Sequence, residues 1–538
     1  MSGSINYSIT GDKSQNLNKL QKWGLALGVI GLFFVLLTWL GNINFKPYWL
    51  FGTLMMLSFS AGAVIYGIGT YRGLPDGIKN NGVYFNSLTN RGTLGWIAGI
   101  ILTLFYVCLY WYGDWFGEST GHEGANEGLV GMFDFLSYSI RGKAADKWFM
   151  YGTFYTIAIL FLGIKFMMKY RHSRYHLIRT VVVMFSQLVL AYFIPYILEA
   201  LNYNMADGGG YYSANPINSW PLNHEFLTPN SIEAQLHDSH QPVGIGYLVW
   251  GIILFLIVTP VVTYFVGKRW YCSWFCGCGG LAETAGDKFR HLSDKSIKAW
   301  RIERWLMHSV MVFVMLMTLA MMFTYFSGSD FSFTAYFPGV YGIIGLIVLM
   351  ALVVGFFLYL YFVSRSKSRN YLLVGAVIAL VMIAIMIIGY FTGKTHVFVI
   401  DSWTIKQGYG FFIGAIFSGI IGVGFYPLLG NRVWCRFGCP MAGYMGIIQR
   451  FKSRFRITTN GGQCISCGNC STYCEQGIDV RWYAQRGQNI TRASCVGCGI
   501  CSSVCPRGVL KLENGPEEGR VNDNPIIIGH DGAIKIVE

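Results

Sequence analysis

The chain has 538 residues, of which 53% are hydrophobic and 13% are charged, about half the charged fraction of ordinary soluble domains. These values and a mean hydropathy of +0.43 exclude a disordered chain, a coiled coil and an ordinary soluble enzyme. A net charge of +14 would suggest a nucleic-acid partner in a soluble protein, but in a membrane protein it is more typical of basic cytoplasmic loops.

Apolar stretches of about 20 residues, long enough to cross a bilayer, recur along the chain. They predict ten membrane spans, at 23–41, 47–71, 93–113, 148–168, 178–198, 243–267, 304–326, 338–363, 371–393 and 409–430. The first span has no small-residue cleavage signature after it, so we expect an anchor and not a signal peptide.

The basic residues predict the orientation of these spans. If the N-terminus is cytoplasmic, the loops outside carry few basic residues, namely Lys46, Arg141, Lys143, Lys147, Lys394 and Lys406. The segment 200–242 contains no Lys or Arg. This asymmetry is typical of a bacterial inner-membrane protein with both termini in the cytoplasm. Because the basic residues are dispersed over many short loops, we expect no nucleic-acid partner.

The predicted fold is a polytopic α-helical membrane protein of about ten spans with a C-terminal α+β ferredoxin-like domain. The expected order is a cytoplasmic segment, a four-helix membrane region, a six-helix membrane core, a basic linker, a two-cluster domain and a hairpin tail. Their bounds are 1–22, 23–177, 178–440, 441–459, 460–511 and 512–538.

Acids are scarce inside the predicted spans, and Glu199, near the outer end of the fifth, is the notable exception. An ionisable group at such a depth is a functional candidate. The following loop holds His224, His237 and His240. A carboxylate or an imidazole can accept the protons of a quinol, so these four residues are the candidate catalytic groups. The histidines could instead bind a metal, or simply lie in a solvated loop.

Two segments share the pattern Gly-x-Arg-x-aromatic-Cys-x3-Cys, one after the sixth span and one after the tenth. They begin at Gly267 and Gly430, and their cysteines are Cys272, Cys276, Cys435 and Cys439. Repeats of the same orientation can be related by an axis along the membrane normal, so the two pairs could meet. Four converging thiols could hold a further iron–sulfur cluster, with Cys278 as a weaker candidate ligand. Unligated cysteines and a redox-active dithiol are the alternatives.

A dense double cysteine motif follows the last span. It predicts two 4Fe-4S clusters, because the fourth cysteine of each run binds the other cluster in two-cluster ferredoxins. One cluster is assigned to Cys464, Cys467, Cys470 and Cys505, and the other to Cys495, Cys498, Cys501 and Cys474. Structural zinc and disulfides fit this spacing and this compartment less well. Glu475 follows Cys474 where proline is common.

Together, the spans, the paired Cys-x3-Cys motifs and the double cluster motif resemble the membrane polyferredoxin family. The resemblance covers about residues 240–280 and 425–510. Its members include the quinol-dehydrogenase membrane subunit of periplasmic nitrate reductase, a membrane iron–sulfur protein of nitrous oxide reduction and a cytochrome oxidase assembly protein that reduces copper. Gly277 departs from the family, which usually has proline there, whereas Pro440 agrees with it.

The resemblance implies electron transfer between the quinone pool, cytoplasmic clusters and a partner redox protein. Two alternatives remain open. One is a maturation protein that reduces copper for a respiratory enzyme and handles metal with its outer-loop histidines. The other is a redox-coupled ion-translocation subunit, which the scarcity of acids in the spans disfavours.

Overall fold

The computed structural model describes most of the chain. The described residues are 17–72, 89–119, 125–203, 214–218, 220–226, 228, 231–232, 235, 241–327, isolated positions between 351 and 388, 402–515, 526–528 and 534–536.

Seven candidate membrane spans lie in this part of the chain, so the protein is membrane-embedded. They are α1 (Lys19–Trp39), α2 (Tyr48–Tyr71), α3 (Thr93–Trp111), α6 (Lys147–Lys169) and the segments Arg174–Leu201, Val243–Val266 and Trp403–Gly424. They coincide with the first six predicted spans and with the tenth. The seventh predicted span lies within α13 (Ile297–Ser327), and those at 338–363 and 371–393 lie outside the described residues. The count of about ten therefore stays a prediction.

The first two spans form a tight antiparallel pair that packs on α6. A Cβ at Gly24 would lie 2.4 Å from the backbone nitrogen of Tyr66, and a Cβ at Gly62 would lie 2.8 Å from the nitrogen of Gly28. Glycines at these positions let the two backbones approach closely, as small residues commonly do between membrane helices. Short helices, α4 (Gly128–Gly131) and α5 (Asp134–Arg141), close the end of this region at which α1 ends and α2 begins.

Three spans contain π-helical stretches. These are Ser186–Phe193 between α7 (Arg174–Phe185) and α8 (Ile194–Tyr203), Leu254–Val258 between α10 (Gln241–Ile253) and α11 (Thr259–Val266), and Gly410–Gly424 between α17 (Ser402–Tyr409) and α18 (Tyr426–Leu429). A proline follows each stretch closely, at Pro195, Pro260 and Pro427. Proline lacks the backbone N–H that would continue the α-helical ladder, which explains why the winding changes there.

The cysteine-rich domain, defined here as residues 455–515, follows α19 (Pro440–Phe451). Its ends pair as antiparallel strands, β1 (Phe455–Thr459) with β2 (Leu510–Asn514). Between them lie α20 (Asn469–Thr472), α21 (Val480–Gln485) and α22 (Ile500–Ser503). Farther along the chain, β3 (Ile526–Ile528) and β4 (Ile534–Ile536) form a second antiparallel pair.

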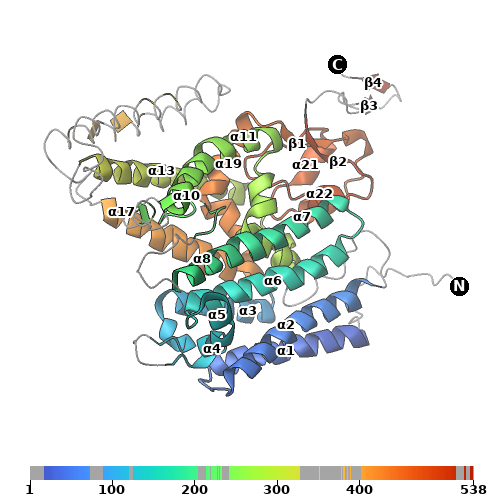
Figure 1. Cartoon of the computed structure of the whole chain (residues 1–538). Helices are drawn as coiled ribbons and strands as arrows, with labels where there is room; N and C mark the ends of the chain where they lie inside the picture. The colour runs from blue at the N-terminus through green and yellow to red at the C-terminus, as the bar shows by residue number, and fades with distance from the viewer. Residues whose placement is uncertain are drawn as a thin grey trace.

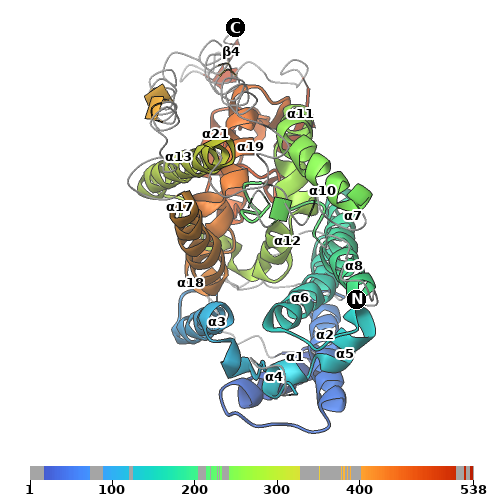
Figure 2. The same cartoon turned by 60° about the vertical axis from the view of Figure 1, so that its left-hand side comes forward.

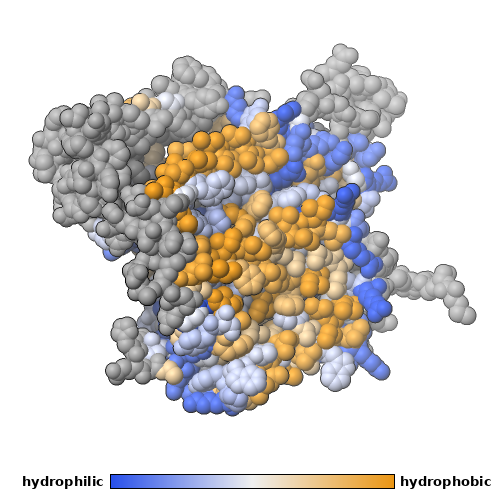
Figure 3. Space-filling model, in the orientation of Figure 1, coloured by the Kyte–Doolittle hydropathy of each residue, from blue (hydrophilic) through white to orange (hydrophobic). Residues whose placement is uncertain are grey.

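The elements are arranged as tilted membrane helices with the cysteine-rich domain against one end (Figure 1). The beginning of α1 lies at the same end of the helices, at the right of the view. The second view shows α12 (Gly277–Thr284) among the longer helices (Figure 2). A broad hydrophobic surface covers the spans and gives way to hydrophilic side chains at the cysteine-rich end (Figure 3). Phe33, Trp96 and Ile100 contribute exposed apolar side chains, as expected of helices that face lipid.

Candidate metal centre

The two Gly-x-Arg-x-aromatic-Cys-x3-Cys segments have the same backbone course. Gly267 and Gly430 have φ values of 72° and 97°, which only glycine adopts without strain. Each is followed by a π-helical turn, Trp270–Phe275 or Trp434–Gly438. Cys276 and Cys439 are then the extended N-cap residues of α12 and α19. We call residues 267–286 the first repeat and residues 430–449 the second repeat.

The structure brings the cysteines of the two repeats together. Cys272, Cys435 and Cys439 are buried in one hydrophobic core, against which Cys276 and Cys278 pack. Arg432 of the second repeat donates from Nη1 to the backbone oxygen of Cys272 at 3.1 Å and to Sγ of Cys435 at 3.5 Å. The prediction that the repeats meet is confirmed. We call Cys272, Cys276, Cys435 and Cys439 the four-cysteine site.

The sequence predicts that these cysteines follow their spans and so lie at the membrane edge. In the structure, the four-cysteine site lies deeper, among the helices. A Cβ at Gly277, next to Cys276, would lie 2.8 Å from Oε1 of Gln187, which is near the middle of the span Arg174–Leu201. A Cβ at Gly438, next to Cys439, would lie 2.5 Å from the Phe417 ring, within the span Trp403–Gly424. Each repeat re-enters the helical region after its span ends, and this reversal corrects the expectation of a site at the membrane edge.

The helix α12 carries the chain of the first repeat back toward the cysteine-rich end. Gly280 approaches Val183, and farther along the helix Glu283 forms an ion pair with Arg179. Beyond the helix, Asp287 pairs with Lys169, the last residue of α6, at 2.5 Å. These contacts show that α12 runs antiparallel to α7. Cys276, at the start of α12, lies at the end of this helix that is farther from the cysteine-rich domain.

In the cysteine-rich domain the structure separates the cysteines into the two predicted groups. Four of them line a common cavity and form what we call the first cluster site: Cys464, Cys467, Cys470 and Cys505. The second cluster site comprises Cys474, Cys495, Cys498 and Cys501, and Cys501 interacts electrostatically with the other three and, less strongly, with Cys470 of the first site. Gly468 and Gly499, with φ values of 79° and 82°, are the N-cap residues of α20 and α22. The equivalent left-handed turns show that the two halves of the domain are built alike.

The surroundings of these thiols agree with binding of iron–sulfur clusters. In the described residues, no three Cys, His, Asp or Glu side chains are grouped closely enough to hold a single metal ion. Burial raises the pKa of the Cys470 thiol to about 12 and that of Cys495 to about 11. Ligand thiols must therefore lose protons as a cluster binds.

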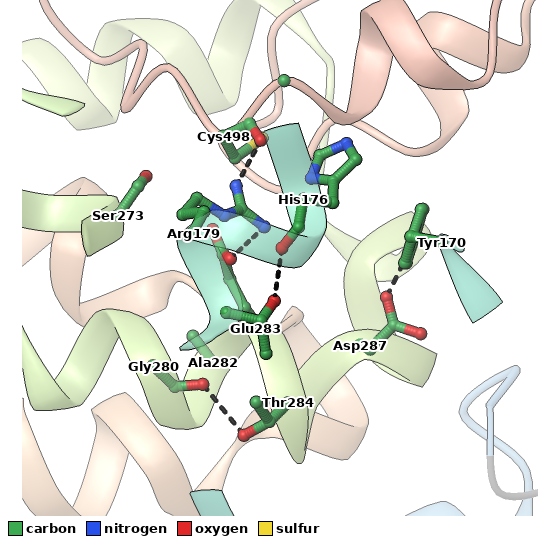
Figure 4. A network of polar contacts seen from close by, with 12 residues as sticks. Tyr170, His176, Arg179, Ser273, Gly280, Ala282, Glu283, Thr284, Asp287 and Cys498 are labelled. Atoms are coloured by element: carbon green, nitrogen blue, oxygen red, sulfur yellow. Dashed lines mark hydrogen bonds and ion pairs between the residues drawn. The ribbon is translucent and has the colours of Figure 1, made fainter. Parts of the chain in front are cut away.

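The second cluster site is docked on the membrane helices through its cysteine loop, residues 495–498. Ser273 of the first repeat donates to the backbone oxygen of Val496 at 2.8 Å, and Tyr175 donates to that of Gly497 at 2.9 Å. Gln449 of the second repeat donates to the oxygen of Cys495 at 2.7 Å. Arg179 donates to the oxygen of Cys498 (Figure 4). Both repeats thus hold the loop that carries two of the predicted ligands.

Buried charges connect the second cluster site to the four-cysteine site. Glu475, adjacent to Cys474 and 1% exposed, pairs with Arg290 at 2.5 Å and with Nε of Arg432 at 3.1 Å. Burial alone raises the pKa of Glu475, but Arg290 and Arg432 outweigh it, so the pKa is lowered and the carboxylate is charged at neutral pH. Arg432, which contacts Cys435, therefore also contacts the residue next to a predicted ligand of the second cluster site.

A second buried acid, Glu283, completes this network. It lies between Arg179 and Arg432, at 2.8 Å from Nη2 of Arg432, and Figure 4 shows its carboxylate facing Arg179. Sequence reasoning missed Glu283 and the partners of Glu475. The available signals were an acid in the short apolar segment after Cys276 and a carboxylate in place of proline after Cys474.

The candidate catalytic residues that the structure describes, Glu199 and His224, lie at the other end of the spans from the cysteine-rich domain and make ordinary ion pairs. The carboxylate of Glu199 forms ion pairs with Arg141, at 3.3 Å, and with Lys143. Nε2 of His224 lies 3.3 Å from Glu225, whose other partner, Lys406, is at 2.5 Å. These contacts give Glu199 and His224 structural partners, and they leave the predicted proton-accepting role untested. His237 and His240 lie outside the described residues.

The loop that contains His224 folds inward, toward the four-cysteine site. The Tyr271 hydroxyl donates to the backbone oxygen of Ile217 at 3.2 Å, and Trp220 and Phe226 belong to the same core as Cys272. No pattern in the sequence predicts this contact, because the loop is polar and a solvated loop is one of the alternatives that the sequence leaves open. Tyr271, which contacts this loop, directly precedes Cys272 in the chain.

Comparisons with known proteins agree with the assignment of the cysteines to iron–sulfur chemistry. A family model described as a 4Fe-4S binding domain matches residues 248–296 and 409–458, and a second model with the same description matches residues 489–511. A stretch of 50 residues is 38% identical to YccM of Escherichia coli (strain K12), provisionally described as an electron transport protein. That stretch covers 9% of this chain and 14% of the relative. No solved structure is significantly similar to the chain. The chain is thus similar to 4Fe-4S binding domains at both repeats and at the second half of the cysteine-rich domain.

Proposed function

We propose that the chain transfers electrons between a soluble redox protein on the cytoplasmic side and the quinone pool of the membrane. The observation that carries the proposal is the order of three cysteine groups. The first cluster site is partly exposed to solvent, at Cys467, the second is docked on the membrane helices, and the four-cysteine site lies beyond it among the spans. Such an order is what a relay from solvent to a membrane-soluble carrier requires.

When bound, iron–sulfur clusters supply one-electron transfer without a change of ligands. The chain's residues bury five of the eight thiols of the inner two sites. Ser273 and Gln449 fix the loop of the second site, and Tyr271 and Trp434 cover the four-cysteine site with aromatic side chains. Arg432 adds a buried positive charge beside Cys435, which would stabilise an anionic centre and raise its potential.

We further propose that the four-cysteine site binds one iron–sulfur cluster, with two ligands from each repeat. The support is that each repeat supplies only two cysteines and that the two pairs converge under one guanidinium group. The 4Fe-4S family model matches both repeats, which agrees with this division. Cys278, which is hydrogen-bonded to Cys276, is a neighbour of the ligand set in this proposal.

The proposed function can be tested with the chemically reduced protein in lipid nanodiscs. After addition of a soluble menaquinone or ubiquinone analogue, we expect the iron–sulfur absorbance and electron paramagnetic resonance signals to report oxidation. Cys435→Ala should slow this oxidation strongly and leave reduction by small molecules intact. Cys108→Ala, at a buried cysteine of α3, is the matched control and should behave as wild type. A protein without iron signals, or one that no quinone oxidises, would contradict the proposal.

A further inference from the structure

The first cluster site opens on the outer face of the cysteine-rich domain. Its cavity is lined by four cysteines, of which Cys467 is exposed. Beside it, Ile465 is 54% exposed and Trp482 is 43% exposed. Large apolar side chains are unusual at the surface of a small polar domain, and together they make a patch that can lose contact with water when a partner binds.

The charges around this patch are of one sign. In residues 460–515, the exposed charged side chains are Arg481, Arg486, Arg507 and Lys511. The three acids of the same segment are Glu475, Asp479 and Glu513. The first is buried, the second accepts from the Ser471 hydroxyl, and the third is half-buried and pairs with Lys511. The solvent-facing part of the domain is therefore basic.

Two of the arginines lie at the mouth of the cluster site itself. Arg481 and Arg507 line the cavity together with the cysteines. Arg486 stacks over the Trp482 ring at 4.0 Å, so it extends the basic area over the apolar patch. We call Ile465, Trp482, Arg481, Arg486 and Arg507 the basic apolar face.

We propose that the basic apolar face is the docking surface for a small acidic electron-carrier protein. The three arginines attract an acidic partner over several ångströms and orient it. Ile465 and Trp482 then exclude water where the two proteins touch. Redox partners commonly use such small, short-lived interfaces. The exposed cysteine at the centre brings a bound carrier next to the first cluster site. The inference rests on the proposed function, since it names the soluble partner of the same relay.

The electron balance of an encounter is simple. The reduced carrier loses one electron and the first cluster site gains it, so the carrier is oxidised and the site is reduced by one equivalent. Neither a bond nor a proton needs to change hands. The docking surface contributes only orientation and proximity between the two centres.

The test uses the full-length, iron-loaded protein in nanodiscs and an acidic flavodoxin, reduced beforehand, as the probe. The variant carries Arg481→Glu and Arg507→Glu. The control variant carries Lys19→Glu and Lys22→Glu, which reverse two exposed charges at the start of α1, away from the cysteine-rich domain (Figure 1). Stopped-flow absorbance gives the rate of cluster reduction, and biolayer interferometry with oxidised flavodoxin gives binding.

We call the protein with Arg481→Glu and Arg507→Glu the cavity variant. At low ionic strength, we expect flavodoxin to reduce its clusters at least about tenfold more slowly than those of wild type, and to bind it more weakly by a similar factor. The wild-type rate should fall with added salt, whereas the rate of the variant should depend on salt only slightly. The control variant should stay close to wild type. Reduction by an uncharged viologen should be the same in all three proteins. If the double reversal impairs folding, Arg481→Gln with Arg507→Gln provides a milder pair with the same expected direction.

Equal reduction rates and equal binding for wild type and cavity variant would overturn the proposal. So would a loss of binding to anionic lipid vesicles with no change in binding to flavodoxin, because the face would then recognise headgroups. A protein that binds no iron would contradict the proposed function itself, and the docking proposal with it. Reduction by viologen without any response to flavodoxin would contradict the docking proposal alone.

Discussion

The two repeats share a backbone but differ in what their arginines contact. In the first repeat, Arg269 lies over the rings of Tyr175 and Phe455, at 5.9 and 4.9 Å from the ring centres. In the second repeat, Arg432 is buried between Glu283 and Glu475 and touches Cys435. The same sequence position thus makes cation–π contacts in one repeat and a buried ionic network in the other.

The repeats also contact each other through their ends: the second residue of each repeat lies against the last residue of the other. In one direction, Gln449 of the second repeat accepts from the backbone nitrogen of Lys268 at 2.8 Å. In the other direction, Gly286 of the first repeat packs against Asn431, where a Cβ would lie 2.5 Å from the Asn431 Cβ. The contact between these equivalent positions is therefore kept in both directions, although the side chains differ.

This difference shows where the similarity between the two repeats ends. In the proposed cluster between the repeats, two ligands come from each repeat, so the shared backbone is what brings the cysteines into equivalent places. The single cysteine-rich domain has no symmetric copy, so only one repeat can receive Glu475. Arg432 makes that contact, whereas the equivalent arginine, Arg269, lies over Phe455 at the edge of the domain.

The largest expected effect is at Arg432. Arg432→Met removes one of the two buried arginine partners of both Glu283 and Glu475, which should lower the free energy of unfolding by about 3–5 kcal/mol. Arg269→Met removes cation–π contacts and should cost about 1–2 kcal/mol. Thermal unfolding of the two variants in detergent, followed by near-ultraviolet circular dichroism, compares them directly. Equal losses would show that the two arginines are equivalent.

The shared backbone should respond equally in both repeats. Gly267→Ala and Gly430→Ala each force a Cβ into a left-handed conformation, at a cost of about 1–2 kcal/mol before any clash. A Cβ would also meet Gln449 and Phe455 in the first repeat, and Ser293 in the second. The same unfolding experiment should give similar losses for the two variants. A large loss in only one of them would mean that the repeats do not share their fold requirement.

A smaller effect is expected where the first repeat holds the second cluster site. Ser273→Ala removes the hydrogen bond to the backbone oxygen of Val496, which should cost about 1 kcal/mol. Hydrogen exchange of residues 495–499 should become faster while exchange in β1 and β2 is unchanged. Unaltered exchange in the cysteine loop would show that this contact does not hold the domain in place.

The sequence predicts much of this molecule because its signals are local. Hydropathy identifies the seven described spans, and the spacing of the cysteines groups them into the sets that the structure separates. The duplicated motif also indicates that Cys272 and Cys435 belong to one site. In each case, a short window of residues carries the information.

The depth of the four-cysteine site and its charge network could not be predicted in the same way. The apolar stretch at α12 is too short to be recognised as a span from hydropathy. The return of α12 into the helical region therefore depends on its packing against α6 and α7. The partners of Glu475 come from positions 290 and 432, and no local pattern links them. Tertiary contacts between distant segments determine these features.

Iron and acid-labile sulfide content test the central claim most directly, because that claim is a redox centre formed jointly by the two repeats. Measured per chain, the eight cysteines of the cysteine-rich domain account for about eight irons. We predict that wild type and Cys108→Ala contain more iron than this, and that Cys435→Ala falls back to about eight. About eight irons in wild type and in Cys435→Ala alike would contradict a cluster between the repeats.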